Sequence, residues 1–385
     1  MTAFYNKPNE LSNNLFIKKM SEKLISNDEI PADLYTEYNV KRGLRNANGT
    51  GVLVGLTKIS HVEGYKVNEN KEKIAVPGKL YYRGYNVEDI VNSFIEEKRF
   101  GFEEITYLLL FGELPNKKQL EDFQHLLGER RELPRGFAWD MILVAPSSSL
   151  MNKLARSVLA LYSYDDNPDD TSIENVLRQS IELIGYFPSL IAYAYQAKRS
   201  FYDNESLHLH YPIPELGTAE NILRMIRPTG EFTQLEAHLL DLSLILHAEH
   251  GGGNNSSFTT HLISSSGTDT YSTIAAAVGS LKGPRHGGAN IKVINMLEDL
   301  KANVKDPGNE KQLEEYFRKV LKGEANDGSG LIYGLGHAIY TLSDPRAVLL
   351  KGMAKKLAEY KGREADFALC EYIENKVPDI YREMT

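Results

Sequence analysis

The chain has 385 residues, enough to bury a large core, and this length suits two or three domains or one large domain with a smaller one. With 42% hydrophobic and 25% charged residues, its composition is that of an ordinary globular protein, which excludes the disordered and fibrous classes. The net charge of −8 argues against binding to nucleic acids or anionic membranes, because clustered lysines and arginines neutralise such surfaces.

The number of cysteines and the N-terminal sequence indicate the cellular compartment of the protein. The single cysteine, Cys370, excludes an internal disulfide framework and any C-x-x-C zinc or redox site, which favours a reducing compartment. The first residues, MTAFYNKPNELSNNLFIKK, lack the basic-then-apolar layout of a signal peptide, and no apolar run approaches the roughly 20 residues that span a bilayer. We therefore predict a soluble, cytoplasmic protein that does not bind a membrane.

The first 85 residues divide into a helical arm and a small β element. One or two amphipathic helices are predicted over residues 1–45 from the spacing of Leu11, Leu15, Ile17, Met20 and Leu24. The following stretch, GLRNANGTGVLVGLTKISHVEGYKV, is rich in Gly, Val and Thr, and it predicts short strands near residues 50–85. Asn48-Gly49 is a candidate hairpin turn.

Beyond residue 85 the pattern becomes helical. Apolar residues recur at helical intervals in FEEITYLLLF and in residues 150–164 and 172–199, with Pro or Gly between the runs. The highly charged residues 301–330 fit an exposed helical excursion at the start of a second domain. We therefore predict a mainly α fold with a helical arm and two domains, over residues 1–45, 46–297 and 298–385.

The stretch HAEHGGGNNSS contains the first candidate site residues. His247 and His250 are three apart, so on the last turn of a helix both rings share one face, and Gly251–Gly253 end that helix. The spacing also suits metal ligands, with His261 and His286 nearby, but neither HExxH nor the PCxxC of zinc deaminases is present. We predict no metal site. Packing together with a surface contact is the alternative for the pair.

The stretch GPRHGGAN places His286 directly before ANIKVINMLEDL, whose apolar spacing predicts a helix. The positive end of the helix dipole lowers the imidazole pKa, and a neutral ring can donate a hydrogen bond to a developing enolate. A turn histidine that caps the helix is the alternative. The preceding run of small residues, 271–281, suits either a subunit interface or a ligand pocket.

The stretch GLGHAIYTLSDPR places His337 nine residues before Arg346. An arginine beside a histidine suits a small dicarboxylate or keto acid, because the guanidinium holds a carboxylate while the imidazole polarises a carbonyl. Alternatively, Asp344-Pro345 simply begins a helix and Arg346 pairs with a neighbouring acid.

Together these stretches resemble the citrate synthase family, in the same order and at plausible intervals. YYRGYNVEDI, FEEITYLLLFGELPN and NKLARSVLALYSYDDNPDD extend the resemblance over residues 40–385. It implies a two-domain, nearly all-α homodimer of the tricarboxylic acid cycle. It also implies an acyltransferase that condenses acetyl-CoA with oxaloacetate to give citrate and CoA, with acetyl-CoA as co-substrate and no permanently bound cofactor.

The resemblance also implies roles for individual residues. His250 binds oxaloacetate, His286 stabilises the enol or enolate of acetyl-CoA, and His337 donates toward the oxaloacetate carbonyl. Arg346 holds an oxaloacetate carboxylate. More weakly, the backbone of Gly334, Leu335 and Gly336 is expected near the CoA.

One departure from the family pattern concerns the catalytic base, an aspartate in a stretch like N-V-D-F-Y-S-G, which is followed by two substrate arginines. These 385 residues end at VPDIYREMT without such a stretch, and Asp366 in EADF does not replace it, because it lies only 29 residues after His337. We therefore expect a fragment that binds substrates poorly and turns over negligibly. The alternatives are a 2-methylcitrate synthase that uses propionyl-CoA and a non-catalytic binding homologue.

Overall fold

The computed structural model describes residues 17–22, 24, 31–41, 43–46, 50–52, 54, 56–70, 72–283, 287–336, 340 and 342–384. It contains two compact units, residues 1–54 and residues 55–385. The candidate site residues all belong to the second unit.

The first unit contains short helical segments. Residues 17–22 are helical and exposed, and α2 (Ala32–Glu37) follows. Arg45 pairs with Gly51 in an isolated antiparallel bridge. Helices are therefore present in the region where the sequence predicts them, although several residues of that prediction lie outside the described part of the chain: Leu11, Leu15, Asn48 and Gly49.

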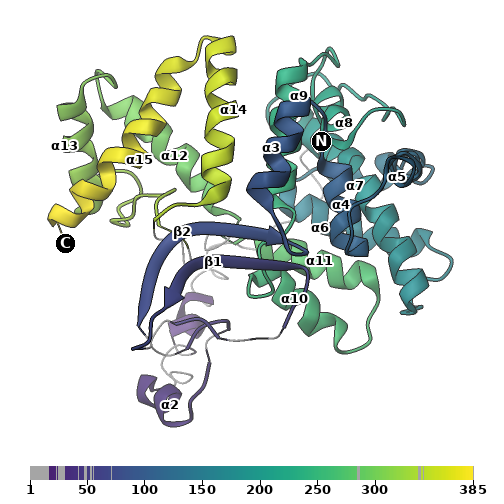
Figure 1. Cartoon of the computed structure of the whole chain (residues 1–385), viewed down its shortest axis with the longest axis horizontal. Helices are drawn as coiled ribbons and strands as arrows, with labels where there is room; N and C mark the ends of the chain where they lie inside the picture. Colours follow the sequence, from purple (N-terminus) through teal and green to yellow (C-terminus); the bar gives the residue numbers. More distant parts are fainter. Residues whose placement is uncertain are drawn as a thin grey trace. The chain divides into compact units, whose positions relative to one another are not determined.

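A small antiparallel sheet opens the second unit (Figure 1), in the order β1 (Ser60–Val67), β2 (Lys73–Tyr82) and β3 (Tyr85–Asn86). The turn between β2 and β3 consists of Arg83 and Gly84, with φ of 50° and 91°. Two successive positive φ values match the right-handed twist of a tight hairpin, and glycine adopts them without strain. The predicted β element near residues 50–85 is confirmed.

The rest of the unit is helical, which confirms the predicted mainly α class (Figure 1). The helices are α3 (Val87–Glu97), α4 (Phe102–Phe111), α5 (Lys117–Glu129), α6 (Leu150–Leu161), α7 (Ile173–Tyr202), α8 (Thr218–Ile226), α9 (Gln234–His247), α10 (Asn255–Ser264), α11 (Thr270–Leu281), α12 (Ala289–Asn303), α13 (Glu310–Leu321), α14 (Pro345–Lys361) and α15 (Glu364–Met384), with the π-helical η1 (Ala138–Leu143) and the 3-10 turn η2 (Tyr162–Tyr164). Within the described residues, no helix combines the length and apolar character that a membrane span requires.

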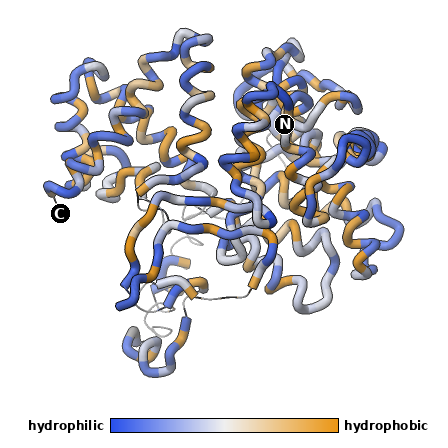
Figure 2. Tube along the Cα trace, viewed as in Figure 1, coloured by the Kyte–Doolittle hydropathy of each residue, from blue (hydrophilic) through white to orange (hydrophobic). Residues whose placement is uncertain are grey.

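Hydrophobic and hydrophilic residues alternate along these helices (Figure 2), as expected where one face is buried. One core joins α6, α7 and α11 around Val158, Leu190 and Tyr271. A second core joins β2, α3, α4, α9 and α14, and includes Leu80 and Met353. This second core matters most for the site, because it fixes the end of α9 and the start of α14 against one strand.

A third core lies among α12, α13 and α15, and α13, in the segment predicted to be an exposed helical excursion, buries one face in it. α12 runs without a break from Ala289 to Asn303, across the predicted domain boundary at residue 297. α14 packs against β2, α3 and α9 as well as against α15. The division into a large and a small domain remains a prediction.

Candidate functional site

The histidine turn after α9 is held by the sheet. α9 ends at His247, and Gly251, with φ of 85°, reverses the chain four residues later. The Glu249 carboxylate accepts hydrogen bonds from the Gly251 backbone N–H at 2.7 Å and from the Ser60 hydroxyl of β1 at 3.0 Å. This carboxylate therefore closes the turn and also attaches it to the sheet.

Tyr82 of β2 provides a second attachment for the same turn. Its side chain is fully buried, and its hydroxyl donates to the backbone carbonyls of Ile245 at 2.9 Å and Glu249 at 3.1 Å. Burial raises the pKa of Tyr82 well above its ordinary value, so the hydroxyl keeps its proton and remains a donor. The end of α9 is thus fixed by a buried neutral phenol.

The loop before α14 attaches to the same strand through Gly78. The Gly78 N–H donates to the Ser343 carbonyl at 3.1 Å. A Cβ atom at Gly78 would lie 2.3 Å from the Ser343 carbonyl oxygen and 2.5 Å from Cδ1 of Tyr340, far inside van der Waals contact. Only glycine lets this loop approach the strand so closely.

His250 and Tyr340 meet where these two segments converge. His250 Nε2 lies 3.2 Å from the Tyr340 hydroxyl, and the ring centroids are 5.4 Å apart in an edge-to-face arrangement. Tyr340 is 5% exposed, and burial, followed by the nearby Asp344 carboxylate, raises its pKa to about 12. Two motifs that lie 90 residues apart in the chain are therefore in direct contact.

Arg346 lies beside this pair, in the first turn of α14. Asp344 caps the helix by accepting the Arg346 backbone N–H at 3.0 Å. The same carboxylate binds the guanidinium through Nε at 3.0 Å and Nη2 at 2.7 Å. The guanidinium carbon also lies 5.7 Å from the centre of the Tyr340 ring. Arg346 therefore combines the two interpretations from the sequence, since it pairs with a neighbouring acid and also lies at the histidine site.

The two histidines of the H-x-x-H motif do not share a helix face. His247 is the last residue of α9, it is exposed, and its Nδ1 lies 2.6 Å from the Ser243 carbonyl. His250 lies beyond the helix, because the turn has already begun at Ala248. The prediction of a shared face is wrong for this reason. In the described part of the chain, no group of three or more His, Cys, Asp or Glu side chains is placed to hold a metal ion.

The predicted CoA-side segment lies beside α12. Gly334 and Gly336 have φ of 89° and 83°, which permits the sharp path of this loop. A Cβ atom at Gly334 would contact the Val293 side chain of α12 at 3.4 Å, and Leu335 packs into the core of α12, α13 and α15. A role of this segment in binding CoA remains a prediction.

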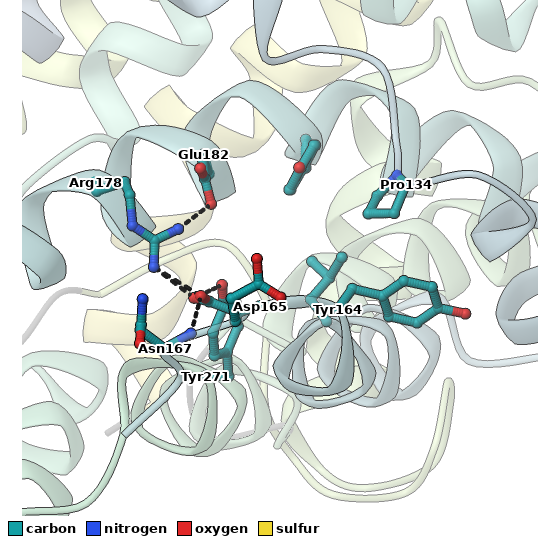
Figure 3. Close-up of a pocket in the computed structure, with 10 residues that line it drawn as sticks. Pro134, Tyr164, Asp165, Asn167, Arg178, Glu182 and Tyr271 are labelled. Carbon is teal, nitrogen blue, oxygen red and sulfur yellow. Dashed lines mark hydrogen bonds and ion pairs between the residues drawn. The ribbon is translucent and has the colours of Figure 1, made fainter. Parts of the chain in front are cut away.

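A charged cavity of about 380 Å³ lies elsewhere in the unit (Figure 3), and the sequence analysis did not anticipate it. Asp165 accepts hydrogen bonds there from Arg178 and Tyr271, both at 2.8 Å. Burial raises the pKa of Asp165, but the hydrogen bonds from the Asn167 N–H, Gln179 and Arg178 outweigh it and lower the pKa to about 2. The lining residues are Pro134, Leu161, Tyr164, Asp165, Asp166, Asn167, Arg178, Glu182, Tyr186 and Tyr271, none of which belongs to the histidine motifs.

Comparison with known proteins identifies the family. A family model for the C-terminal domain of citrate synthase matches residues 46–385. The citrate synthase of Haloferax volcanii is 32% identical over 343 residues, which cover 87% of this chain and 79% of that protein. This chain belongs to the citrate synthase family. Citrate synthase 2 of Bacillus subtilis is also similar, with 31% identity over 84% of this chain and 80% of that protein.

The fold agrees with the sequence relatives. The crystal structure of citrate synthase from Pyrobaculum aerophilum superposes with a TM-score of 0.68 at 29% identity, covering 88% of this chain and 79% of that one. Citrate synthase from Thermotoga maritima superposes with a TM-score of 0.63, also at 29% identity, covering 86% and 78%. The predicted family and its helical fold are therefore confirmed. Citrate synthases use acetyl-CoA as a co-substrate and carry no permanent cofactor.

Only some of the predicted citrate synthase site residues are among those that the structure describes. His250 and Arg346 lie together at Tyr340, as described above. His286 and His337 lie outside the described residues, so their predicted roles remain predictions from the motifs. α12 does begin at Ala289, directly after the GPRHGG stretch, in agreement with the helix predicted there.

Asp366 lies in the first turn of α15, on the surface. Its carboxylate pairs with Lys301 of α12 at 2.6 Å and with Arg363. These partners lower its pKa, the Lys301 hydrogen bond most, and hold it as a carboxylate on a helix surface. The prediction that Asp366 does not serve as the citrate synthase base stays a prediction, and the observed ion pairs support it.

Sequence reasoning missed the residues that attach the two motifs to the sheet: Ser60, Gly78, Tyr82, Glu249 and Tyr340. Only Gly78 gave a usable signal, since a Pro-Gly pair within a predicted strand marks a close approach of another backbone. Tyr340 was part of the motif GLGHAIYTLSDPR, but its spacing carried no information about a partner 90 residues away.

Proposed function

We propose that this chain provides the oxaloacetate-binding part of a citrate synthase site, in which acetyl-CoA condenses with oxaloacetate to give citrate and CoA. Family membership supports the reaction. The observation that carries the proposal is the convergence of His250 and Arg346 at Tyr340. One imidazole and one guanidinium, both partly buried, suit a small keto dicarboxylate.

In the proposed chemistry, a base removes a proton from the methyl group of the thioester, and the electron pair forms an enol or enolate. A neutral His286 donates a hydrogen bond to the thioester oxygen as negative charge develops there. The new carbon–carbon bond forms between the methyl carbon and the ketone carbon of oxaloacetate. His337 donates toward the ketone oxygen, and Arg346 and His250 hold the dicarboxylate. Water then cleaves the thioester and releases CoA.

The base is assigned to no residue of this chain. The family resemblance calls for an aspartate in an N-V-D-F-like stretch, and these 385 residues contain no such stretch. The proposal therefore separates two properties. Oxaloacetate binding is assigned to His250 and Arg346, whereas negligible turnover is expected of the 385 residues by themselves.

We also propose a homodimer, in keeping with the family resemblance. Several large apolar side chains around η1 and α6 are exposed to solvent, including Trp139 at 60%, Val144 at 75% and Leu159 at 50%. η1 packs on α6, so these residues lie in one region of the unit. Exposed apolar side chains on packed elements support a subunit interface there. Light scattering on the chain and on Trp139→Ser tests this; a monomeric parent protein would contradict it.

Titration calorimetry with oxaloacetate tests the main proposal. Arg346→Gln keeps a hydrogen-bonding side chain but removes the charge, and we expect oxaloacetate affinity to fall at least tenfold, because a charge-assisted bond to a carboxylate is lost. Arg382→Gln, an exposed arginine on α15, is the matched control and leaves affinity unchanged. Equal binding by the parent chain and Arg346→Gln contradicts the proposal.

A citrate-forming assay with acetyl-CoA and with propionyl-CoA covers the remaining alternatives. It is applied to the 385 residues. Normal turnover would contradict the expectation of negligible turnover. A preference for propionyl-CoA would identify 2-methylcitrate formation.

A further inference from the structure

One carboxylate, Asp327, joins two stretches of the chain that lie beside different histidine motifs. Its Oδ2 atom accepts hydrogen bonds from Nζ of Lys292, in the first turn of α12, at 2.9 Å and from the Tyr333 hydroxyl at 2.7 Å. α12 directly follows the GPRHGG stretch, and Tyr333 directly precedes the predicted CoA-side segment, Gly334–Gly336, which leads into His337. Asp327 therefore connects the chain just after the second motif to the chain at the third.

The charge of Asp327 settles the direction of these hydrogen bonds. Hydrogen bonds from Ser329, and then from Tyr333 and Lys292, hold its pKa well below the ordinary value of an aspartate. The side chain is therefore a carboxylate, which only accepts, so the phenol and the ammonium both donate to it. The Ser329 backbone N–H donates to the other oxygen, Oδ1, at 3.2 Å. The Lys292 ammonium also lies 5.5 Å from the centre of the Tyr333 ring.

The backbone between α13 and the CoA-side segment has few constraints of its own. The described residues between α13 and α14 form no helix or strand. Among them, positive φ values occur at Gly323, Asn326, Gly328, Gly330, Gly334 and Gly336. Glycine loses more conformational freedom on ordering than any other residue, so a loop of this composition depends on side-chain contacts to hold one conformation. The hydrogen bonds to Asp327 are contacts of this kind.

α12 provides the fixed side of the contact. It is a helix of 15 residues, and its Leu300 is fully buried in the core of α12, α13 and α15. Asp299 of the same helix accepts the Asn326 backbone N–H at 3.2 Å and so holds the start of the loop. Asp327 comes next in the chain. It extends this attachment along the loop as far as Tyr333.

We propose that Asp327 is a positioning residue that holds the CoA-side segment against the start of α12 before CoA binds. It acts through Tyr333, which is bonded to Gly334, and through Lys292, which belongs to the helix. A segment that is already ordered binds its ligand without the entropy cost of becoming ordered. This inference rests on the proposed function and on the predicted place of Gly334–Gly336 beside CoA, and it adds the group that orders them.

Nitrogen-15 relaxation of the Gly334 amide tests the inference without any ligand. Tyr333-Gly334 is the only Tyr-Gly pair in the sequence, so carbonyl carbon-13 tyrosine combined with nitrogen-15 glycine isolates this amide in the 385-residue chain. We expect an order parameter of about 0.85 in the parent chain, as in rigid backbone, and below about 0.6 in Asp327→Ala. A mobile Gly334 in the parent chain overturns the inference, and so does an equally rigid one in Asp327→Ala.

Lys292→Met is a second, milder variant. It removes the cation but leaves the hydrogen bond from Tyr333, so the order parameter of Gly334 is expected to fall by less than in Asp327→Ala. This variant decides the question if Asp327→Ala does not fold. An unchanged order parameter in Lys292→Met then overturns the inference.

Asp366→Ala is the matched control. Asp366 accepts a hydrogen bond from Lys301, near the other end of α12, at 2.6 Å, and its side-chain exposure of 36% is close to the 30% of Asp327. Its removal deletes an ion pair with the same helix but at a distance along the chain from the loop, and we expect Gly334 to stay rigid. An equal fall of the order parameter in both alanine variants would show a general loosening and would overturn the specific role of Asp327.

Titration calorimetry with CoA links the position of the segment to the proposed function. The dissociation constant for CoA is expected to rise about five- to thirtyfold in Asp327→Ala, the cost of ordering one backbone residue on binding. It stays within error in Asp366→Ala. The constant for oxaloacetate stays within error in both variants, because His250 and Arg346 are held by β2 and α14 instead. An equal loss of affinity for both ligands overturns the specific role of Asp327.

The two experiments separate the inference from the proposed function. CoA binding by the parent chain with an unaltered constant in Asp327→Ala overturns the inference and leaves the proposed function intact. A rigid Gly334 that becomes mobile in Asp327→Ala, without CoA binding by any variant, supports the positioning role of Asp327 and contradicts the proposed function.

Discussion

Removal of the Tyr82 hydroxyl measures how strongly the sheet holds the histidine turn. In Tyr82→Phe the ring still fills its place in the core, but the carbonyls of Ile245 and Glu249 lose a buried donor. Ile245 retains the N–H of Ala248 at 3.2 Å, so one of the two carbonyls keeps a partner. One carbonyl therefore loses a buried hydrogen bond and the other keeps only one of its two donors. This loss lowers the free energy of unfolding by about 1–2 kcal/mol.

Urea unfolding at pH 7 measures this change. Tyr65→Phe is the control, because Tyr65 on the neighbouring strand is 42% exposed, and removal of its hydroxyl changes stability by less than about 0.5 kcal/mol. Oxaloacetate affinity falls in Tyr82→Phe and stays constant in the control, because His250 follows the turn. If Tyr82→Phe unfolds at the same urea concentration as the parent chain, the turn is held by contacts other than this hydroxyl and the reasoning is refuted.

High pH offers an independent check on the same residue. Burial raises the pKa of Tyr82 above its ordinary value of 10.0, so the folded chain keeps the phenol proton while the unfolded chain releases it. The contribution of Tyr82 is therefore complete below pH 10 and falls as the pH rises above it. The stability difference between the parent chain and Tyr82→Phe shrinks from pH 9 to pH 11. A constant difference would contradict the assigned burial.

Three further substitutions test neighbouring features. Burial raises the pKa of Asp241 from 3.8 to about 7, so the stability of the parent chain falls as the pH rises from 4 to 7. Asp241→Asn can accept only one of the Gly101 and Phe102 N–H groups and is less stable than the parent at pH 4, but this deficit in unfolding free energy narrows toward pH 8 in urea titrations; a difference that does not depend on pH would refute this. In Gly78→Ala the added methyl group pushes Ser343 away, which lowers the free energy of unfolding by about 1–3 kcal/mol and abolishes oxaloacetate binding. An unchanged oxaloacetate affinity in titration calorimetry would contradict the close approach. In Asp344→Asn the side chain still caps α14, but it no longer competes with oxaloacetate for the Arg346 guanidinium. Titration calorimetry is therefore expected to show tighter oxaloacetate binding. Weaker binding would mean that the Asp344 carboxylate orients the guanidinium.

Much of the fold was accessible from local sequence patterns. The Gly, Val and Thr-rich stretch before residue 85 predicted strands, and apolar spacing predicted the long helices, because burial of one face imposes a fixed period on a strand or helix. The Asp344-Pro345 pair predicted the start of α14, where Asp344 does cap the helix. These features depend on residues within a few positions of one another, so local sequence patterns are enough to predict them.

The arrangement of the site was less accessible, because it depends on contacts between distant segments. The shared face of His247 and His250 was predicted from helical spacing, but α9 ends at His247 and the turn is held by Ser60 and Tyr82 instead. The histidine and arginine motifs indicated which residue types gather at the site. Their separation in space is set by β2, and although the sequence predicted strands there, it did not indicate that this strand contacts both motifs.

That strand, β2, sets the distance between the two motifs by its own geometry. Gly78, Leu80 and Tyr82 are its buried positions, and they alternate with the less buried Lys79 and Tyr81, so all three lie on one face. Gly78 binds the loop before α14 through backbone, and Tyr82 binds the turn after α9 through its hydroxyl. Four residues of strand span about 13 Å, a separation that a pair of facing aromatic and imidazole side chains can bridge. Because both attachments are to the same rigid strand, a change at Gly78 or Tyr82 alters the position of one motif relative to the other without touching His250 or Arg346.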